Sequence, residues 1–331
     1  MRLVPLLAVL LVACSVEVAP PPGDVVAVPA TTSSTEAVVP STATPSTTTG
    51  SPTTTIGVPA AGTTPTGVVV PVRSSAEGRY LVGTPCAAAA VVAAGLLTPL
   101  PQVDVLLDPG HGGEVETGAI GPNGVREADL NLVVARKLAA VLDERGIGAA
   151  ISRGGDYRMA IAARVELAAA LRPALFVSIH HNAGSIGPAD EPGTIVFHQV
   201  DNEASRRAAG LAYEEMVAAF EPLDLPWVNS FEPGAFAAIR ASDERDAYGV
   251  LRRNDVPAIL TEALFIQNGP EAEALATDEV QDLEVEALAN AIERFLTTND
   301  PGSGFREPEV YDFPVSPTGG TAGCEDPDLG T

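Results

Sequence analysis

Apolar and polar positions follow a regular pattern only between about residues 102 and 298. Within this segment, short apolar runs of strand length are separated by longer stretches in which apolar residues recur at helical spacing. Strands are expected at 103–107, 147–152, 174–180, 194–199 and 257–261, and helices at 127–145, 157–171, 203–220 and 273–296. This alternation predicts an α/β fold, in which a mixed, largely parallel sheet is flanked by helices on both faces.

The first 70 residues lack this pattern and are rich in Thr, Ser, Pro and Val. Residues 1–14 have the features of a lipoprotein-type signal peptide, because Arg2 precedes an apolar run too short to cross a bilayer. The sequence Leu11-Val12-Ala13-Cys14 resembles the bacterial lipobox, so we expect lipidation at Cys14 and an exported protein anchored in the cell membrane. Cleavage followed by free secretion is the alternative.

The remaining boundaries follow from composition. Residues 15–70 are expected to form a disordered tether, and residues 71–101 a lead-in segment that packs on the main domain as an edge element. The main domain is expected to span 102–298, and the acidic, Pro/Gly-rich residues 299–331 are expected to form a tail.

Charge excludes several kinds of partner. The formal net charge is −24 and the isoelectric point about 4.3. Such a chain repels nucleic acids and anionic lipid surfaces, so we expect no nucleic-acid binding and membrane contact only through a lipid anchor. We expect a monomer.

Two cysteines remain besides Cys14. Cys86 and Cys324 favour a disulfide, because an exported protein meets an oxidising compartment. Two unrelated thiols are the alternative.

The four histidines are few enough that their positions are informative. His111 follows the first expected strand, and His180 ends the apolar strand 174–180. Ligands bind at the carboxyl ends of strands in open α/β sheets, so both imidazoles could reach one metal ion. Glu127, at the start of a helix, is the best third ligand, and Glu262 ends another strand beside the position of a metal-bound water. Asn131, one helical turn after Glu127, could orient it.

Spacing alone leaves alternatives open. A loop histidine or a glutamate at a helix start often only caps or solvates the structure. The Gly-rich loop at 110–113 could also cradle a phosphate, although it lacks the Lys-Ser/Thr of a P-loop and the spacing of a dinucleotide fingerprint.

Four motifs carry a more specific resemblance. They are Asp108-Pro109-Gly110-His111-Gly112-Gly113, Arg126-Glu127…Asn131-Leu132, Ser178-Ile179-His180…Asn182-Ala183 and Pro257-Ala258-Ile259-Leu260-Thr261-Glu262…Asn268. In this order and at these separations they resemble the zinc-dependent N-acetylmuramoyl-L-alanine amidases, cell-wall enzymes with a zinc-exopeptidase-like fold. The resemblance covers roughly 102–298 and is to members with a single catalytic domain, as found in actinobacteria.

The resemblance implies the roles of the site residues. It implies that His111, Glu127 and His180 bind Zn²⁺ and that Glu262 is the catalytic acid/base. The substrate would be peptidoglycan or muramyl peptides, cut between N-acetylmuramic acid and L-alanine during wall remodelling, turnover or daughter-cell separation. A zinc peptidase acting within the stem peptide and a non-catalytic wall-binding lipoprotein are the competing interpretations.

Further residues could support the ligands or contact the substrate: Asn131, His181, Asn182 and Arg153. His181 stands where the family usually has a small residue, and we favour a supporting role for its imidazole over direct participation. Leu264 stands where the family commonly has Gly, which affects the expected shape of the substrate groove. For Arg153, salt bridges that hold the sheet edge are favoured over substrate contact.

Overall fold

A six-stranded mixed sheet forms the centre of the molecule. The computed structural model describes residues 57–184, 187–229, 232–311 and 319–331, so the expected signal peptide and most of the expected tether lie outside the described residues. The strand order is β12-β10-β14-β8-β6-β7. The bounds are β12 Gly234–Phe236, β10 Ile195–His198, β14 Ala258–Phe265, β8 Leu175–Asn182, β6 Val105–Pro109 and β7 Ala149–Ile151.

Strand directions give the sheet its mixed character. β7, β6, β8 and β14 pair in parallel, whereas β10 pairs antiparallel with β14 and parallel with β12. The parallel strands therefore end together at one edge of the sheet. This arrangement confirms the predicted α/β class with a mixed, largely parallel sheet.

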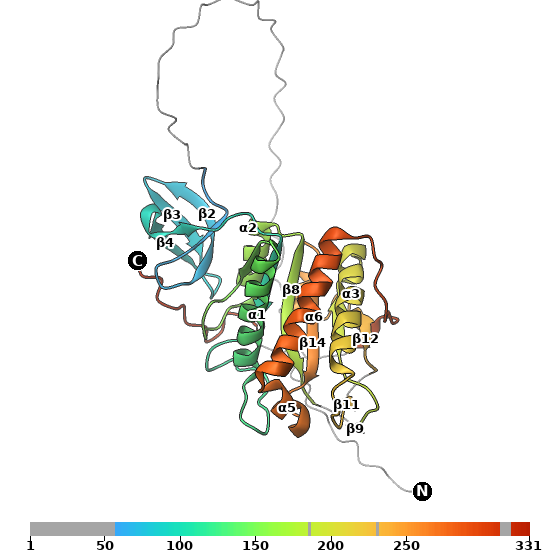
Figure 1. The fold of residues 1–331 in the computed structure, drawn as a ribbon. Helices are drawn as coiled ribbons and strands as arrows, with labels where there is room; N and C mark the ends of the chain where they lie inside the picture. Colours follow the sequence, from blue (N-terminus) through green and yellow to red (C-terminus); the bar gives the residue numbers. More distant parts are fainter. Residues whose placement is uncertain (1–56, 185–186, 230–231, 312–318) are drawn as a thin grey trace, which may run out of the picture. The chain divides into compact units, whose positions relative to one another are not determined.

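Helices cover both faces of the sheet. On one face lie α1 (Glu127–Glu144), α3 (Glu203–Phe220) and α6 (Asp278–Thr297), side by side as Figure 1 shows. Their buried stripes, which include Leu138, Leu211 and Leu288, form one core with the sheet. On the opposite face, α2 (Ile161–Leu171) and α4 (Gly249–Arg252) contribute to a second core.

Two helix boundaries differ from the expectation. The expected single helix at 273–296 is divided into α5 (Gly269–Leu275) and α6, because the Thr277 side chain accepts a hydrogen bond from the Val280 amide and caps a new helix. α2 begins at Ile161 instead of Tyr157. The amides of Ala160 and Ile161 donate to the carbonyls of Pro85 and Gly319, outside the helix.

The segment before the main sheet is a second sheet and not an edge element. Its strands are β1 (Ala61–Thr63), β2 (Val69–Ala76), β3 (Arg79–Gly83), β4 (Ala89–Ala93) and β5 (Thr98–Pro99), in the order β4-β3-β2-β1-β5, with a short 3₁₀ turn at Ala94–Leu96. The expected boundary at residue 70 is therefore wrong, because ordered strand begins before it. Buried side chains, among them Val70, Val82 and Val92, give this small sheet a core of its own.

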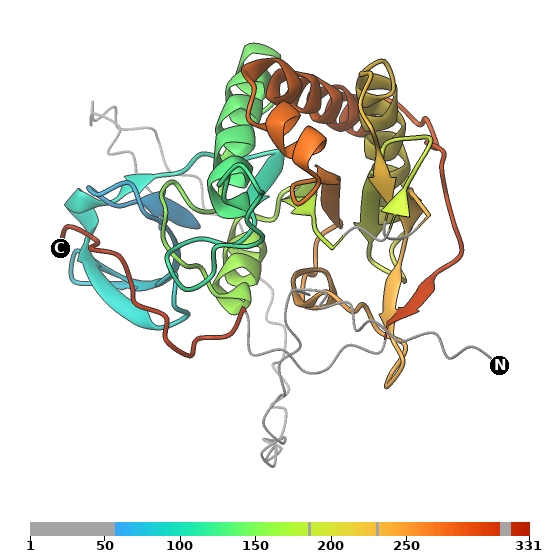
Figure 2. The ribbon, with the colours of Figure 1, turned by 90° about the horizontal axis from the view of Figure 1, so that it is seen from below.

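The described residues after α6 contact both sheets and do not form a free tail, and Phe305 forms a β-bridge with Ala235 of β12. β15 (Glu309–Tyr311) pairs with β13 (Ala238–Arg240), and the Arg206 guanidinium lies 3.8 Å from the Phe305 ring centroid. Leu329 is buried in the core of the small sheet, and Figure 2 shows the C-terminal segment running along that sheet.

The predicted disulfide between Cys86 and Cys324 is confirmed. It joins the loop before β4 to the C-terminal segment, with a Cα–Cα distance of 5.6 Å. The Cys86 amide also donates to Asp326 Oδ1 at 2.8 Å.

Two short elements complete the fold, β9 (Gly187–Pro188) and β11 (Val228–Asn229), which pair with each other. None of the helices in the described part of the chain combines the length and apolar character that crossing a membrane requires.

Removal of the disulfide should lower stability. The bridge spans 238 residues of sequence, so its loss increases the freedom of the unfolded chain, and Cys86→Ala/Cys324→Ala is expected to lose about 2–5 kcal/mol of unfolding free energy. Thermal unfolding of both proteins, with and without reductant, measures the effect. Reductant should lower the midpoint of the wild type and leave the double variant unchanged; a wild-type midpoint that ignores reductant would contradict the expectation.

Candidate metal centre

The sheet register brings the predicted ligands to one edge. On neighbouring strands, His180 of β8 pairs with Glu262 of β14, and Pro109 of β6 pairs with Ile179 of β8. His111 follows β6 by two residues, and Glu127 is the first residue of α1. All four side chains therefore originate at the carboxyl edge of the parallel strands, where open α/β sheets bind their ligands.

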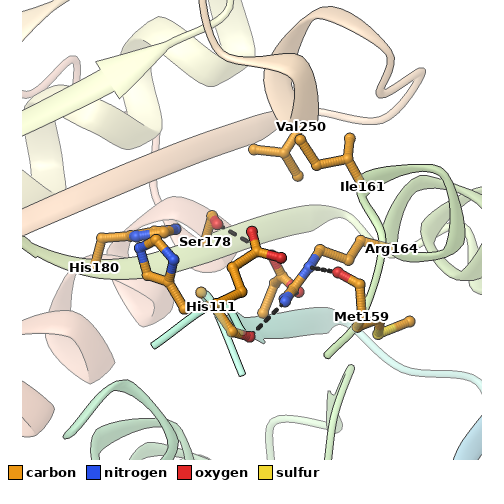
Figure 3. A pocket seen from close by; sticks show the side chains of 10 residues that line it. His111, Met159, Ile161, Arg164, Ser178, His180 and Val250 are labelled. Atoms are coloured by element: carbon orange, nitrogen blue, oxygen red, sulfur yellow. Dashed lines mark hydrogen bonds and ion pairs between the residues drawn. The ribbon is translucent and has the colours of Figure 1, made fainter. Parts of the chain in front are cut away.

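Three side chains converge closely enough to share an ion. Glu127 Oε1 lies 3.2 Å from His111 Nε2 and 3.0 Å from His180 Nδ1. One ligand atom from each residue lies within 4.8 Å of the others, and all three side chains are buried. The two imidazoles line a cavity of about 20 Å³, together with Arg164 and Ser178. Figure 3 shows the His111 and His180 rings side by side at this cavity.

Two glycines allow this close approach. A Cβ on Gly110 would lie 2.1 Å from the His180 ring, and a Cβ on Gly118 would lie 2.5 Å from Glu127 Oε2. Gly118 also has a φ of +68°, a conformation that favours glycine. The glycines in these loops are therefore required by the packing of the ligand side chains.

Two buried arginines hold the turn that carries His111. Arg153 donates from Nε to the Pro109 carbonyl at 3.0 Å and from Nη2 to the Gly110 carbonyl at 2.9 Å. Arg164 donates from Nη2 to the His111 carbonyl at 2.7 Å, drawn in Figure 3, and pairs with Asp108. These bonds satisfy consecutive buried carbonyls at a residue, His111, whose own φ is +60°.

Arg153 was a candidate for substrate contact or a salt bridge at the sheet edge. Within the described residues, its guanidinium donates to main-chain carbonyls, including that of Ala128 in α1 at 2.6 Å. Burial, together with the charge of Arg164, lowers the pKa of Arg153 to about 10. Arg153 thus fixes the backbone around the metal centre, whereas the salt bridge belongs to Arg164.

The two carboxylates have opposite electrostatic surroundings. Burial by itself raises the pKa of Glu127, but the charges and hydrogen bonds of His111 and His180 outweigh burial and hold it well below the usual value. Burial, followed by repulsion from Glu127, raises the pKa of Glu262 well above the usual value. Glu127 is therefore suited to remain an anion, and Glu262 is suited to hold a proton.

The outer oxygens of the two carboxylates also differ. Glu127 Oε2 accepts a hydrogen bond from the Ala119 amide at 2.8 Å, which fixes its orientation. Glu262 Oε2 is buried and has no hydrogen-bond partner among the described residues. Such an atom is costly unless a ligand or substrate completes its bonding.

The remaining candidates all lie next to the centre. Asn131 donates from Nδ2 to the Gly110 carbonyl at 3.3 Å, and its Oδ1 lies 2.8 Å from His181 Nδ1. Asn182 donates from Nδ2 to the carbonyls of Gly193, at 2.9 Å, and of Glu262, at 3.2 Å. These contacts are with the supporting framework.

Glu284 of α6 also belongs to these surroundings and was not predicted from the sequence; its Oε2 lies 3.1 Å from His181 Nε2. A signal was present, because Glu284 falls on the apolar face of its helix between Val280 and Leu288.

Comparison with known proteins agrees with this geometry. Residues 105–294 match the family model described as N-acetylmuramoyl-L-alanine amidase, Amidase_3. The chain belongs to this family. The enzymes so named hydrolyse the amide bond between N-acetylmuramic acid and L-alanine in peptidoglycan, and this hydrolysis is the activity of the chain. The match runs from β6 into α6 and includes all four predicted ligand and catalytic positions.

Individual relatives support the assignment. The chain is 30% identical to the amidase AmiA of Salmonella typhimurium over 217 residues, which are 57% of this chain and 74% of AmiA. It is 33% identical over 220 residues to the uncharacterized protein YqiI of Bacillus subtilis, covering 66% of this chain and 93% of YqiI. The crystal structure of an N-acetylmuramoyl-L-alanine amidase from Clostridium difficile 630 aligns with a TM-score of 0.51 and 26% identity, over 60% of this chain and 100% of that one.

The close approach at Gly110 can be tested directly. Gly110→Ala should displace the His180 ring, weaken binding of a divalent metal and lower unfolding stability by about 1–3 kcal/mol, as overpacking of a buried site does. Chelator competition and thermal unfolding measure the two effects. Gly95→Ala is the matched control, because a Cβ there meets nothing within 4 Å. Unchanged metal affinity in Gly110→Ala would contradict the proposed packing.

Proposed function

We propose that this amidase is zinc-dependent, with His111, Glu127 and His180 as the zinc ligands and Glu262 as the catalytic acid/base. The observation that carries the proposal is the convergence of two imidazole nitrogens and one carboxylate oxygen within 4.8 Å in a buried site. Two histidines and one glutamate form a donor set of catalytic zinc sites, in which a fourth position stays open. The family assignment supports the same metal.

In this proposal the zinc ion and the protein side chains have different roles in the reaction. Bound zinc lowers the pKa of water and polarises the scissile carbonyl. The chain supplies the rest of the site: Glu127, oriented by the Ala119 amide, stays anionic between the two histidines. The arginine-bound turn keeps His111 in place.

Glu262 is placed to move the proton. It lies beside His180 in the sheet register, and its Oε2 is free of protein partners within the described residues. As its pKa is raised by burial and by the Glu127 charge, its carboxylate can take a proton from the attacking water and retain it. The same proton then passes to the amine of L-alanine, which leaves as the new amino terminus of the stem peptide.

We also propose that the protein works from the cell membrane as a monomer. The lipobox-like sequence ending at Cys14 supports lipidation, and the residues after Cys14 would connect the anchor to the first described strand, β1. An enzyme held in this way would act on the wall above the membrane, in remodelling, turnover or daughter-cell separation.

Product identity tests the reaction and its metal. The full-length protein is incubated with peptidoglycan and with muramyl peptides, with zinc or with a chelator, and the products are identified by mass spectrometry. We expect zinc-dependent release of intact stem peptides that begin with L-alanine. Cuts inside the stem peptide would instead indicate a peptidase, and no cleavage by the zinc-loaded protein would indicate a wall-binding protein.

Glu262→Gln should lose about 10²–10⁴-fold in turnover while zinc still binds, because proton transfer is removed and the three ligands remain. Zinc content and initial rates are measured together on the same preparations. Glu279→Gln, at an exposed position of α6, is the matched control and should keep the wild-type rate. A Glu262→Gln protein with full turnover would remove Glu262 from the mechanism.

Cys14→Ser tests the anchor. If Cys14 is lipidated, the wild type should fractionate with membranes and the variant should be released or should retain an uncleaved leader. Fractionation followed by mass analysis of the N-terminal peptide distinguishes these forms. An unlipidated wild-type N-terminus would favour free secretion.

A further inference from the structure

Next to the candidate metal centre, three buried polar side chains from three elements form a hydrogen-bonded network. Glu284 of α6 faces His181 of β8, with Oε2 and Nε2 3.1 Å apart. His181 Nδ1 lies 2.8 Å from Asn131 Oδ1 in α1, and Asn131 Nδ2 donates to the Gly110 carbonyl at 3.3 Å. All three side chains are at most 1% exposed.

The carbonyl of Gly110, at one end of this network, determines which group donates and which accepts at each contact. The Gly110 carbonyl can only accept, so it requires the NH₂ group of Asn131 to face it. The Asn131 oxygen then faces His181, and His181 Nδ1 must carry a proton to donate to it. The contact between His181 Nε2 and Glu284 Oε2 then needs one further proton, carried by either group, and with it Glu284 holds the imidazole from its other side.

This network of side chains reaches the proposed metal ligands through the backbone. Gly110 immediately precedes His111, and the His181 amide, which follows His180, lies 3.4 Å from Glu127 Oε1. Through these contacts His181 links the helix that begins with Glu127, the strand that carries His180 and the turn that carries His111.

The stability of the fold alone does not explain why these polar side chains are buried together. Glu284 is fully buried, and its Oε1 has no hydrogen-bond partner within the described part of the structure. Replacing a buried ionic or polar pair with apolar residues of similar volume is often neutral or stabilising.

We propose that His181 and Glu284 are positioning residues of the metal centre. They orient the Asn131 amide, and Asn131 in turn holds the Gly110 carbonyl and the backbone of His111 at the distance that the ligand set requires. The proposal rests on the proposed zinc-dependent function, since the ligands it positions are those assigned there. Residues that support metal ligands in this way commonly change metal affinity or activity 10–100-fold when replaced.

The decisive variant removes both partners together. His181→Ala alone leaves Glu284 buried without its partner, and it should unfold more easily. The double variant His181→Ala/Glu284→Leu removes that unpaired group and should recover much of the melting temperature. If the pair positions the site, zinc affinity and kcat should nevertheless remain lower by about 10–100-fold, with KM little changed. A double variant with wild-type zinc affinity and kcat would overturn the proposal.

Asn131→Leu supplies a second test that leaves no charge buried alone. It should reproduce the loss of zinc affinity, and adding it to the double variant should cause little further loss, because all three residues act through one route. If the losses of zinc affinity multiplied in the triple variant, His181 and Glu284 would not act through Asn131. Ser205→Ala is the control for general destabilisation, since Ser205 is buried and bonds to Ala258 at the opposite end of β14.

The readouts separate this proposal from the function on which it rests. Zinc affinity is measured by competition with a chromophoric chelator and needs no substrate. Chelator-sensitive amidase activity of the wild type, recorded in the same series, tests the proposed function. A wild type without that activity would contradict the function, whereas unchanged affinities across the variants would contradict only the positioning roles.

Discussion

The metal centre depends on how the chain turns at the end of β6. His111 adopts a positive φ and Gly110 lies against the His180 ring, and the carbonyls of this turn accept hydrogen bonds from side chains. Arg153, in the loop after β7, and Arg164, in α2, supply donors to these carbonyls. Because each guanidinium offers five donors in a fixed plane, two side chains are enough to hold a turn that no secondary structure would hold.

The rest of the site follows once this turn is fixed. The backbone position of His111 determines where Glu127 can meet both imidazoles, and Glu127 then sets the electrostatic environment of Glu262. The negative charge of Glu127 is stabilised by two histidines, whereas Glu262 has only the apolar surroundings and the repulsion of Glu127. Two glutamates of the same intrinsic acidity are thereby separated, because the pKa of Glu127 is lowered and that of Glu262 is raised.

The sequence predicted the parts of this protein that depend on local pattern. The strands and the helix from Glu127 had clear periodicity, and the ligands lie at strand ends or a helix start, where α/β topology brings residues together. The break at Thr277 was missed because the apolar stripe continues across it and only a side-chain cap interrupts the helix. The small sheet was missed because its strands are short and its core needs Leu329, far away in sequence. The pairing of Glu284 with His181 depends on the packing of α6 over β8, which no local pattern encodes.

The contribution of Leu329 and Cys324 to the small sheet has a consequence for the order of folding. Strands β1 to β5 precede the six-stranded sheet in the sequence, yet the side chain that completes their core and the cysteine that pairs with Cys86 follow it. The core of the small sheet can therefore be completed only after the amidase domain has been synthesised. Its disulfide can form only once the chain has reached an oxidising compartment. A chain that stopped before Leu329 would leave this core incomplete and expose the small sheet to proteases.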